Sequence, residues 1–410
     1  MAVKIKSNNN NNNKKNIVIN QKNIRKVNIV VGIPSLNEGD NISFVVKQVD
    51  NGLIKYYKNY KAVIINLDNN SDDDTKEKFL TTKTKTPKIY ISTPGEIRGK
   101  GYNFYNLFNK VVSLKAKAIM VVDADLESIK PEWVRLLIRP ILKGYDYVTP
   151  YYARSEYDGS ITNHICYPLI YGLYGQNIRQ PIGGDFSFSA KLAKHWLEQT
   201  WHKTTYKYGI DIFMTMNAVL GGFKISQVGL GAKIHKPSAP KLGPMFSQVI
   251  TTLFKNITAN KENWFKIIKE EDIPFLGKSN LDKPQTLSVD YKGMKATAVF
   301  NFHTNEDILK RVLNPIVFKK LKKMYDKEKI IIDSNLWWKI VYDAIYAYDR
   351  MDLNGGLVEA LKPLYFGRFI SFFKETLEKP FEICEGEINN QAKLFWKNRN
   401  YLIKKLKRKR

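Results

Sequence analysis

The feature that most limits how this chain can fold is a regular alternation of short apolar runs and helix-forming segments. Each run is too short for a buried helix and is rich in the β-branched residues that strands favour. The runs cover residues 27–35, 62–68, 88–92, 118–125 and 145–153. Because continuous apolar strands that alternate with helices need cover on both faces, the sequence predicts an α/β fold with a mostly parallel sheet.

The chain has 410 residues, which is long enough for two domains. The α/β domain is expected over residues 27–243. Beyond it, long aromatic-rich segments of helical period predict a helical C-terminal domain over residues 244–398. The Asn-rich and Lys-rich residues 1–26 are expected to form a disordered tail, and residues 399–410 a basic tail.

The formal net charge is +27, from 66 Lys and Arg against 39 Asp and Glu. This excess suits nucleic acid, an anionic membrane surface or anionic substrates, but it also follows from a composition biased towards Lys, Asn and Ile. No zinc-finger spacing or aromatic RNA-binding pattern accompanies the charge, so nucleic acid is disfavoured as a partner. Cys166 and Cys384 are far apart, and no run resembles a signal peptide or a membrane span, so a reducing, cytoplasmic location is expected.

Polar or glycine-rich segments follow four of the predicted strands, at residues 35–38, 68–71, 93–101 and 123–125. In open parallel sheets, ligands bind beyond the carboxyl ends of the strands. We therefore expect these four segments to lie together along one edge of the sheet.

Two of these segments carry residue types that suit a metal and a phosphate. Asp123 and Asp125 are two residues apart on an extended chain, so their carboxylates point to the same side and could hold Mg²⁺ or Mn²⁺. The alternative is a turn with an Asx cap. Lys100 lies between two glycines before a helix, which is typical of a phosphate site, although a flexible loop would look the same.

Three further polar residues stand out downstream in apolar surroundings. Asp185 follows two glycines, which indicates either a tight turn or backbone brought close to a ligand. Asp211 lies in the first turn of an apolar helix, where a carboxylate usually complements the helix dipole. His235 follows a predicted short strand, and a lone histidine is more often structural than a metal ligand.

The order of the motifs resembles that of GT-A glycosyltransferases. The motifs are PSLNE, DNNSD, GKG, DAD, GGD, YGID and IHK. More narrowly, the chain resembles the retaining enzymes that make glucosylglycerate, mannosylglycerate and glucosyl-3-phosphoglycerate, over roughly residues 27–250. The resemblance implies a Rossmann-like GT-A sheet, a UDP- or GDP-hexose donor, a small hydroxy-acid acceptor and a product of the compatible-solute type. It also favours a homodimer.

The resemblance also implies roles for individual residues. Asp125 would bind the divalent metal, with Asp123 and His235 assisting, and the catalytic carboxylates would be Asp185 and Asp211. The nucleotide sugar would contact Pro34, Leu36, Glu38, Asp68, Lys100, Asp123 and Gly184. The acceptor would lie against Gly159, Ser160 and Thr162, with Arg154 or Lys236 available for its carboxylate.

One position departs from the pattern of the 3-phosphoglycerate enzymes, because Ser160 stands where they carry an arginine for the acceptor phosphate. Serine cannot replace the bidentate contact of a guanidinium, so unphosphorylated glycerate is the expected acceptor. Three alternatives remain: a glucosyl-3-phosphoglycerate synthase, an inverting transferase with Asp185 or Asp211 as base that acts on a polysaccharide or lipid-linked acceptor, and a non-catalytic binding protein.

Overall fold

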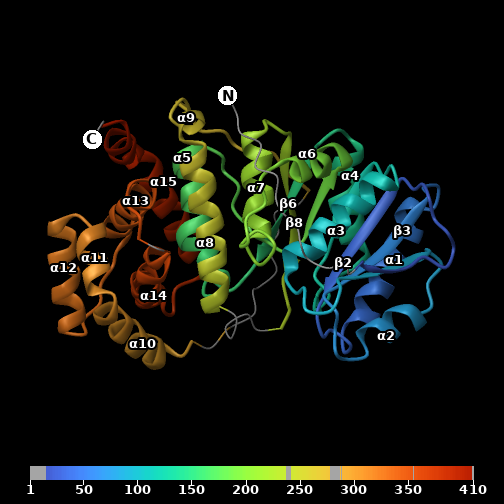
Figure 1. Ribbon diagram of the computed structural model, residues 1–410, viewed down its shortest axis with the longest axis horizontal. Coiled ribbons are helices and arrows are strands. Elements are labelled where there is room, and N and C mark those ends of the chain that lie inside the picture. The colour runs from blue at the N-terminus through green and yellow to red at the C-terminus, as the bar shows by residue number, and fades with distance from the viewer. Residues whose placement is uncertain (1–14, 237–241, 278–286, 288, 354, 409–410) are drawn as a thin grey trace.

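The computed structural model describes residues 15–236, 242–277, 287, 289–353 and 355–408 (Figure 1). Its centre is a nine-stranded sheet in the order β1-β4-β3-β2-β5-β7-β6-β8-β9. The strands are β1 (Ile17–Ile19), β2 (Ile29–Ser35), β3 (Ala62–Asp68), β4 (Lys88–Ser92), β5 (Ala118–Val121), β6 (Tyr147–Ala153), β7 (Phe186–Ser189), β8 (Ile225–Ala232) and β9 (Phe275–Leu276). Only β1 and β7 run antiparallel to their neighbours, so the predicted mostly parallel sheet is confirmed for the described residues.

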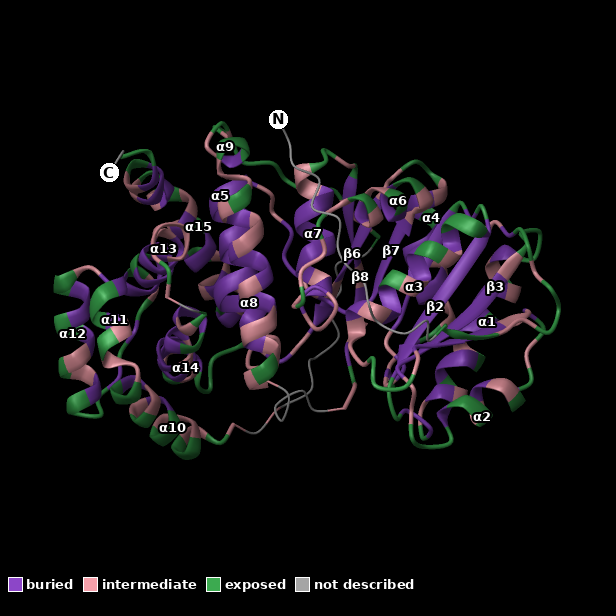
Figure 2. Ribbon diagram, in the orientation of Figure 1, coloured by how far each residue is buried: buried purple, intermediate pink, exposed green. Residues whose placement is uncertain are grey.

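Helices cover both faces of this sheet, as its apolar strands require (Figure 2). Successive residues of β2 point to opposite faces, so Val31 packs in one hydrophobic cluster and Val30 in the other. The Val31 face is covered by α1 (Ile42–Tyr57), α2 (Thr75–Thr81) and α4 (Pro131–Leu142). The opposite face is covered by α3 (Lys100–Ser113), α6 (Ala190–Glu198) and α7 (Ile210–Leu220).

The hydrophobic cluster on the α3 face continues into a helical C-terminal part, which lies at the other end of the molecule in Figure 1. Its helices are α8 (Leu242–Ala259), α9 (Lys261–Trp264), α10 (Tyr291–Thr304), α11 (Glu306–Val312), α12 (Pro315–Asp326), α13 (Ser334–Arg350), α14 (Gly356–Thr376) and α15 (Phe381–Lys407). A π-helical turn, Thr162–Cys166, and α5 (Tyr167–Tyr174) pack against α14 and α15. The expected domain boundary after residue 243 falls inside α8 and stays a prediction.

Both expected tails contain regular structure. Ile17–Ile19 forms β1, which pairs with the edge strand β4, because an unpaired sheet edge accepts any extended segment that reaches it. At the other end, α15 continues to Lys407, and Leu402, Ile403 and Leu406 are buried on one side of it. Three apolar residues at helical spacing thus anchor a segment whose many lysines predicted only a solvated tail.

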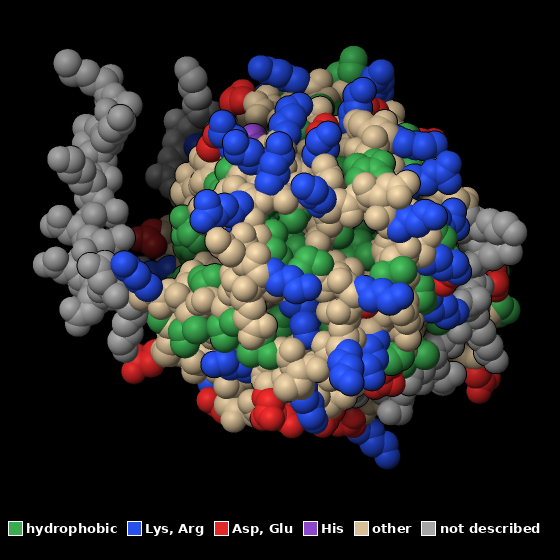
Figure 3. Space-filling model, turned by 90° about the vertical axis from the view of Figure 1, so that its right-hand side faces the viewer, with side chains coloured by type: hydrophobic (Ala, Val, Ile, Leu, Met, Phe, Trp, Pro, Cys, Tyr) green, Lys and Arg blue, Asp and Glu red, His purple; other side chains and the backbone are tan. Residues whose placement is uncertain are grey.

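The positive charge is visible on the end of the molecule that carries α1 and α2. Figure 3 shows Lys and Arg side chains spread across this end, with apolar side chains between them. Among the described residues, no helix has the length and apolar character needed to cross a membrane.

Candidate active site

The first two strand ends are joined by hydrogen bonds between their loops. The backbone N–H groups of Asn37 and Glu38 donate to the hydroxyls of Ser71 and Thr75, at 2.8 Å in each case. The loop before α3 joins them, because Gly99 N–H donates to the Asn69 side chain at 3.1 Å. The predicted meeting of these segments on one edge of the sheet is therefore observed.

Of the residues assigned to the nucleotide, Asp68 is fully engaged within the protein. Its two carboxylate oxygens accept hydrogen bonds from the side chains of Ser35, Ser71 and Tyr90, and it is 1% exposed. Asp68 thus fixes the shape of the edge in this structure. Pro34 is buried in β2, whereas Leu36 is exposed beside it.

Glu38 is buried in the same corner. Its carboxylate accepts from the ammonium of Lys236 at 2.7 Å. Burial nevertheless raises its pKa, and the nearby charge of Asp125 adds to this effect. Lys236, one of the two cations expected for the acceptor carboxylate, therefore has an acidic partner already.

Five charged side chains form the centre of the site, and we call them the carboxylate–lysine cluster: Asp123, Asp185, Asp211, Lys100 and Lys233. The Lys100 ammonium lies 2.9 Å from one oxygen of Asp123 and 3.7 Å from Asp211. Lys233 lies 2.8 Å from Asp185 and 3.4 Å from the other oxygen of Asp123. Asp123 is thus held between two ammonium groups.

The pKa values follow from this arrangement. Burial alone would raise the pKa of Asp123, but Lys100 and Lys233 outweigh it and hold that pKa well below its usual range. Burial raises the pKa of Asp211, because a single lysine at 3.7 Å compensates it only in part. Asp211 is therefore more easily protonated than Asp123.

Asp125 is different, because no hydrogen bond or ion pair of the described residues reaches its carboxylate. Burial, and then the neighbouring charge of Asp123, raises its pKa. A partly buried carboxylate without a direct ion-pair partner is the group that a divalent ion would neutralise.

The carbonyl oxygen beside Nδ1 of His235 favours the tautomer in which a histidine can bind a metal through Nε2. Its Nδ1 lies 2.7 Å from the carbonyl oxygen of Lys236, to which an Nδ1–H would donate, and this leaves the Nε2 lone pair free to coordinate. Here Nε2 points to Asp158, at 3.5 Å. Among the described residues, no three His, Cys, Asp or Glu side chains are gathered closely enough to hold a metal on their own.

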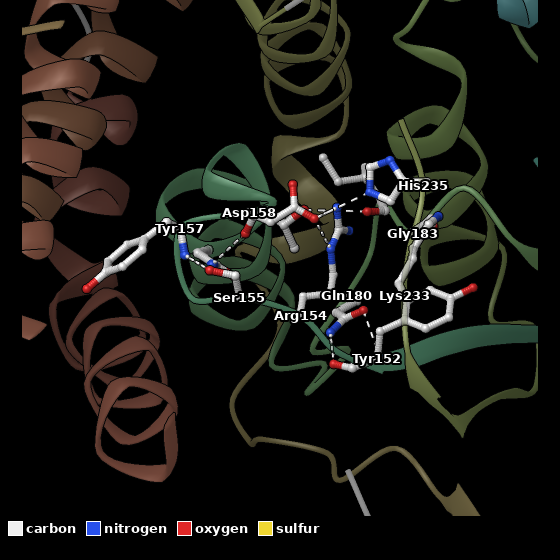
Figure 4. A network of polar contacts seen from close by, with 12 residues as sticks. Tyr152, Arg154, Ser155, Tyr157, Asp158, Gln180, Gly183, Lys233 and His235 are labelled. Carbon is white, nitrogen blue, oxygen red and sulfur yellow. Dashed lines mark hydrogen bonds and ion pairs between the residues drawn. The ribbon is translucent and has the colours of Figure 1, made fainter. Parts of the chain in front are cut away.

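The expected acceptor residues surround a second, smaller network (Figure 4). Arg154 donates twice to one oxygen of Asp158, at 2.6 and 2.8 Å, and the same carboxylate faces His235. Gly159 adopts φ +63°, and a Cβ there would lie 3.3 Å from the Arg154 guanidinium. Glycine at this position therefore leaves room for Arg154.

The hydroxyls of Ser160 and Thr162 both have hydrogen-bond partners within the protein. Ser160 is 5% exposed, and its hydroxyl shares a short hydrogen bond with that of Tyr365 on α14. Thr162 contacts the carbonyl oxygen of Ile182 at 3.4 Å. The cavity beside them measures 10 Å³, room for about one water molecule.

Sequence reasoning missed three residues of the site. Lys233 stands two positions before His235 and reaches Asp185 and Asp123. Tyr152 donates its hydroxyl to Asp185, and Asp158 joins Arg154 to His235. The only signal for Lys233 was a charged residue inside an apolar strand pattern, and nothing in the sequence pointed to the other two.

The close approach of Asp123 leaves no room for a side chain at residue 184. Gly184 has φ +85°, and a Cβ at this residue would come within 2.2 Å of an Asp123 carboxylate oxygen. The chain can therefore pass beside Asp123 only as glycine.

Comparison with known proteins gives one family and several relatives. The model of glycosyl transferase family 2 matches residues 30–200. A glucosyl-3-phosphoglycerate synthase of Petrotoga mobilis is 25% identical over 239 residues, which cover 53% of this chain and 69% of the relative.

Solved structures of glucosyl-3-phosphoglycerate synthase from Mycobacterium tuberculosis are also similar. One, in complex with Mn²⁺, UDP and phosphoglyceric acid, is 25% identical with a TM-score of 0.45, and covers 56% of this chain and 78% of its own. Another, in complex with Mg²⁺ and UDP, is 24% identical with a TM-score of 0.44, and covers 56% of this chain and 79% of its own.

The sheet with its edge of polar loops and the match together define a glycosyltransferase of the GT-A type. The expected enzyme class is thereby confirmed. Within that class, residues 30–200 match the model of glycosyl transferase family 2.

Proposed function

We propose that this glycosyltransferase moves a hexose from a nucleotide diphosphate sugar to glycerate or a similar small hydroxy acid, with the help of Mg²⁺ or Mn²⁺ and with retention of configuration. The observation that carries the donor half is the carboxylate–lysine cluster at the edge of the sheet, with Lys100 at a helix start and Asp125 uncompensated beside it.

The metal site would consist of Asp125 and His235, with Asp123 close by. Two protein ligands are enough, because Mg²⁺ in sugar-nucleotide sites takes further oxygens from the substrate phosphates and water. Bound there, the ion would stabilise the negative charge of the diphosphate leaving group.

Side chains of the protein would bind the phosphate and the sugar of the donor. Lys100 is the first residue of α3 and would hold a phosphate oxygen, its charge shared with Asp123. Asp185 and Asp211 would accept hydrogen bonds from the hydroxyls of the transferred sugar. Burial raises the pKa of Asp211, which favours proton exchange at this carboxyl.

The proposal for the acceptor rests on the charges of the residues that line the small cavity. The residues around the small cavity include two arginines, Arg154 and Arg179, and each is paired with a carboxylate, Asp158 and Glu385 respectively. The pocket is therefore close to neutral, which suits an acceptor with one carboxylate better than one that also carries a phosphate. An acceptor carboxylate would take the place of Asp158 beside Arg154.

A second candidate is transfer to 3-phosphoglycerate. It is favoured by the name of the Petrotoga mobilis relative, and at 25% identity the acceptor could differ. The reaction is otherwise the same.

The deciding experiment is a matrix of donors and acceptors. UDP-glucose, GDP-glucose and GDP-mannose are each tested with glycerate and with 3-phosphoglycerate, with and without Mg²⁺ or Mn²⁺. We expect metal-dependent transfer to glycerate and an α-linked product by NMR, the anomer of the donor. Turnover with 3-phosphoglycerate alone would establish the second candidate, and an inverted anomer would exclude retention. No transfer or hydrolysis of any donor would contradict both candidates.

A further inference from the structure

A second cavity lies where the C-terminal ends of α6, α7 and α8 meet. We call it the α6–α8 cavity. Its volume is 350 Å³, within the usual size range of small-molecule sites. It is lined by His195, Gln199, Thr200, His202, Phe213, Asn217, Leu220, Gly221, Lys255, Asn256, Ala259, Asn260 and Asn263.

The lining is dominated by side-chain amides, and four of them are oriented by their own helices. The amide N–H groups of Gln199, Asn217, Asn256 and Asn260 each donate to the backbone carbonyl four residues earlier, at 2.8 to 3.1 Å. Their carbonyl oxygens accept no hydrogen bond from any described residue. The cavity therefore carries a set of uncommitted acceptors.

Asn217 is the strongest case. Asn217 is 6% exposed, so it is almost completely surrounded by protein. Its Nδ2 donates a hydrogen bond to the carbonyl oxygen of Phe213 at 2.8 Å. Its amide oxygen is not among the fully buried atoms that lack a partner, so it is open to the cavity, where a water or a ligand can donate to it.

The same lining also offers donors but no carboxylate. Lys255 has no acidic partner among the described residues. Burial, and then the charge of Lys255, lowers the pKa of His202, so this imidazole is neutral at pH 7 and presents one N–H. Phe213 and Leu220 supply apolar surface.

A ligand must match this mixture. An anion would use only the donors and a cation only the acceptors, whereas every hydroxyl group both donates and accepts. We propose that the α6–α8 cavity is a second binding site, for a neutral sugar or polyol.

The cavity is separate from the transferase site but linked to it by two segments. Asp211 lies in the first turn of α7 and Leu220 at its last residue, about 14 Å apart along the helix, and Phe213 of the same helix lines the cavity between them. Residues 199–209 begin at the cavity, with Thr200 and His202, and end against the start of α3. There Gly101 and Tyr102 donate backbone hydrogen bonds to Lys207 and Tyr206. Occupancy of the cavity should therefore restrain the segment that supports Lys100.

The test uses the full-length protein with glucose, maltose and glycerol as probes. Saturation-transfer NMR should give a saturable signal for at least one probe, and hydrogen exchange of residues 199–209 should slow in its presence. Asn256→Leu and Asn217→Leu should each weaken binding about tenfold, the effect of losing one well-formed hydrogen bond in a small site. Asn256 is half-buried, so its variant should fold even where the Asn217 variant does not.

The matched control is Asn398→Leu. Asn398 also donates its amide to the carbonyl four residues earlier, at 2.8 Å, but it lies on α15 and does not line the cavity. Its variant should bind the probe like the wild type. The proposal is overturned if no probe gives a saturable signal, if Asn256→Leu binds as tightly as the wild type, or if inorganic phosphate displaces the sugar and binds through Lys255.

Discussion

The ammonium of Lys233 lies 2.8 Å from the carboxylate of Asp185, and the two side chains are 4% and 0% exposed. The same ammonium also donates to the carbonyl of Gly183, so Lys233 binds the glycine turn and its aspartate together. Burial opposes the charged form of Lys233, but Asp185 and Asp123 outweigh it and raise its pKa. The two side chains thus form an ion pair inside the protein.

Replacement of Lys233 by Met should therefore be strongly destabilising. It leaves Asp185 buried without its cation, and breaking one half of a buried ion pair costs about 3–5 kcal/mol. The measurement is urea denaturation at pH 7. Lys55→Met is the control, because Lys55 also pairs with a carboxylate, at 3.1 Å from Glu132, but at the surface. Equal stability of the two variants would show that Lys233 is not needed to balance the buried charge.

Asp125→Asn should lower the rate of metal-dependent turnover about 100-fold or more, because the Asp125 carboxylate is the proposed metal ligand. The same variant should be more stable than the wild type at pH 7. Burial raises the pKa of Asp125 in the folded state above 3.8, its ordinary value in the unfolded chain. As pH rises from 3.8 to the folded-state pKa, the unfolded chain loses this proton first, and the protein becomes less stable.

The gain of Asp125→Asn should disappear below about pH 3.8, where the carboxyl is protonated in both states. Thermal melts of both proteins at pH 7 and near pH 3 measure this. Retention of metal-dependent transfer by the Asn variant would contradict the assignment of the metal, and a variant less stable than the wild type at pH 7 would contradict the charge argument.

The sequence predicted the parts of the site that follow from strand periodicity. Asp123 and Asp125 end an apolar run, and β3 and β4 have the bounds that their composition implied. What it could not predict arises from contacts between distant segments. Lys233 reaches Asp123 across 110 positions of sequence, and Asp68 proved to be occupied by Tyr90 and two serines. Such pairings depend on which loops the fold brings together.

Arg154→Met should raise the KM for the acceptor by about 10- to 100-fold and leave the KM for the donor unchanged. A hydrogen bond to a charged group contributes about 1.5–3 kcal/mol, and Arg154 is the proposed partner of the acceptor carboxylate. Steady-state kinetics with each substrate varied in turn measure both constants. Arg139→Met, at an exposed arginine on α4, is the control. A change in donor KM alone would place Arg154 on the nucleotide instead.

The hydroxyls of Ser160 and Tyr365 connect the proposed acceptor loop to α14 and should be coupled energetically. Ser160→Ala or Tyr365→Phe leaves one buried hydroxyl unpaired, at about 1–3 kcal/mol each. The double variant removes both polar groups and should lose less stability than the sum of the two. A double-mutant cycle in urea measures the coupling, and strictly additive losses would mean that the contact contributes nothing.

Gly184→Ala and Gly144→Ala separate backbone strain from crowding of the site. Both glycines have positive φ, +85° and +96°, so alanine at either position should cost about 1–2 kcal/mol of stability. A Cβ on Gly184 would lie 2.2 Å from Asp123, whereas a Cβ on Gly144 meets no atom within 4 Å. Only Gly184→Ala should therefore displace Asp123 and reduce kcat/KM for the donor, by tenfold or more, since each tenfold corresponds to about 1.4 kcal/mol. Donor kinetics and thermal melts of the two variants provide the measurement, and equal activity in both would mean that the position of Asp123 does not limit catalysis.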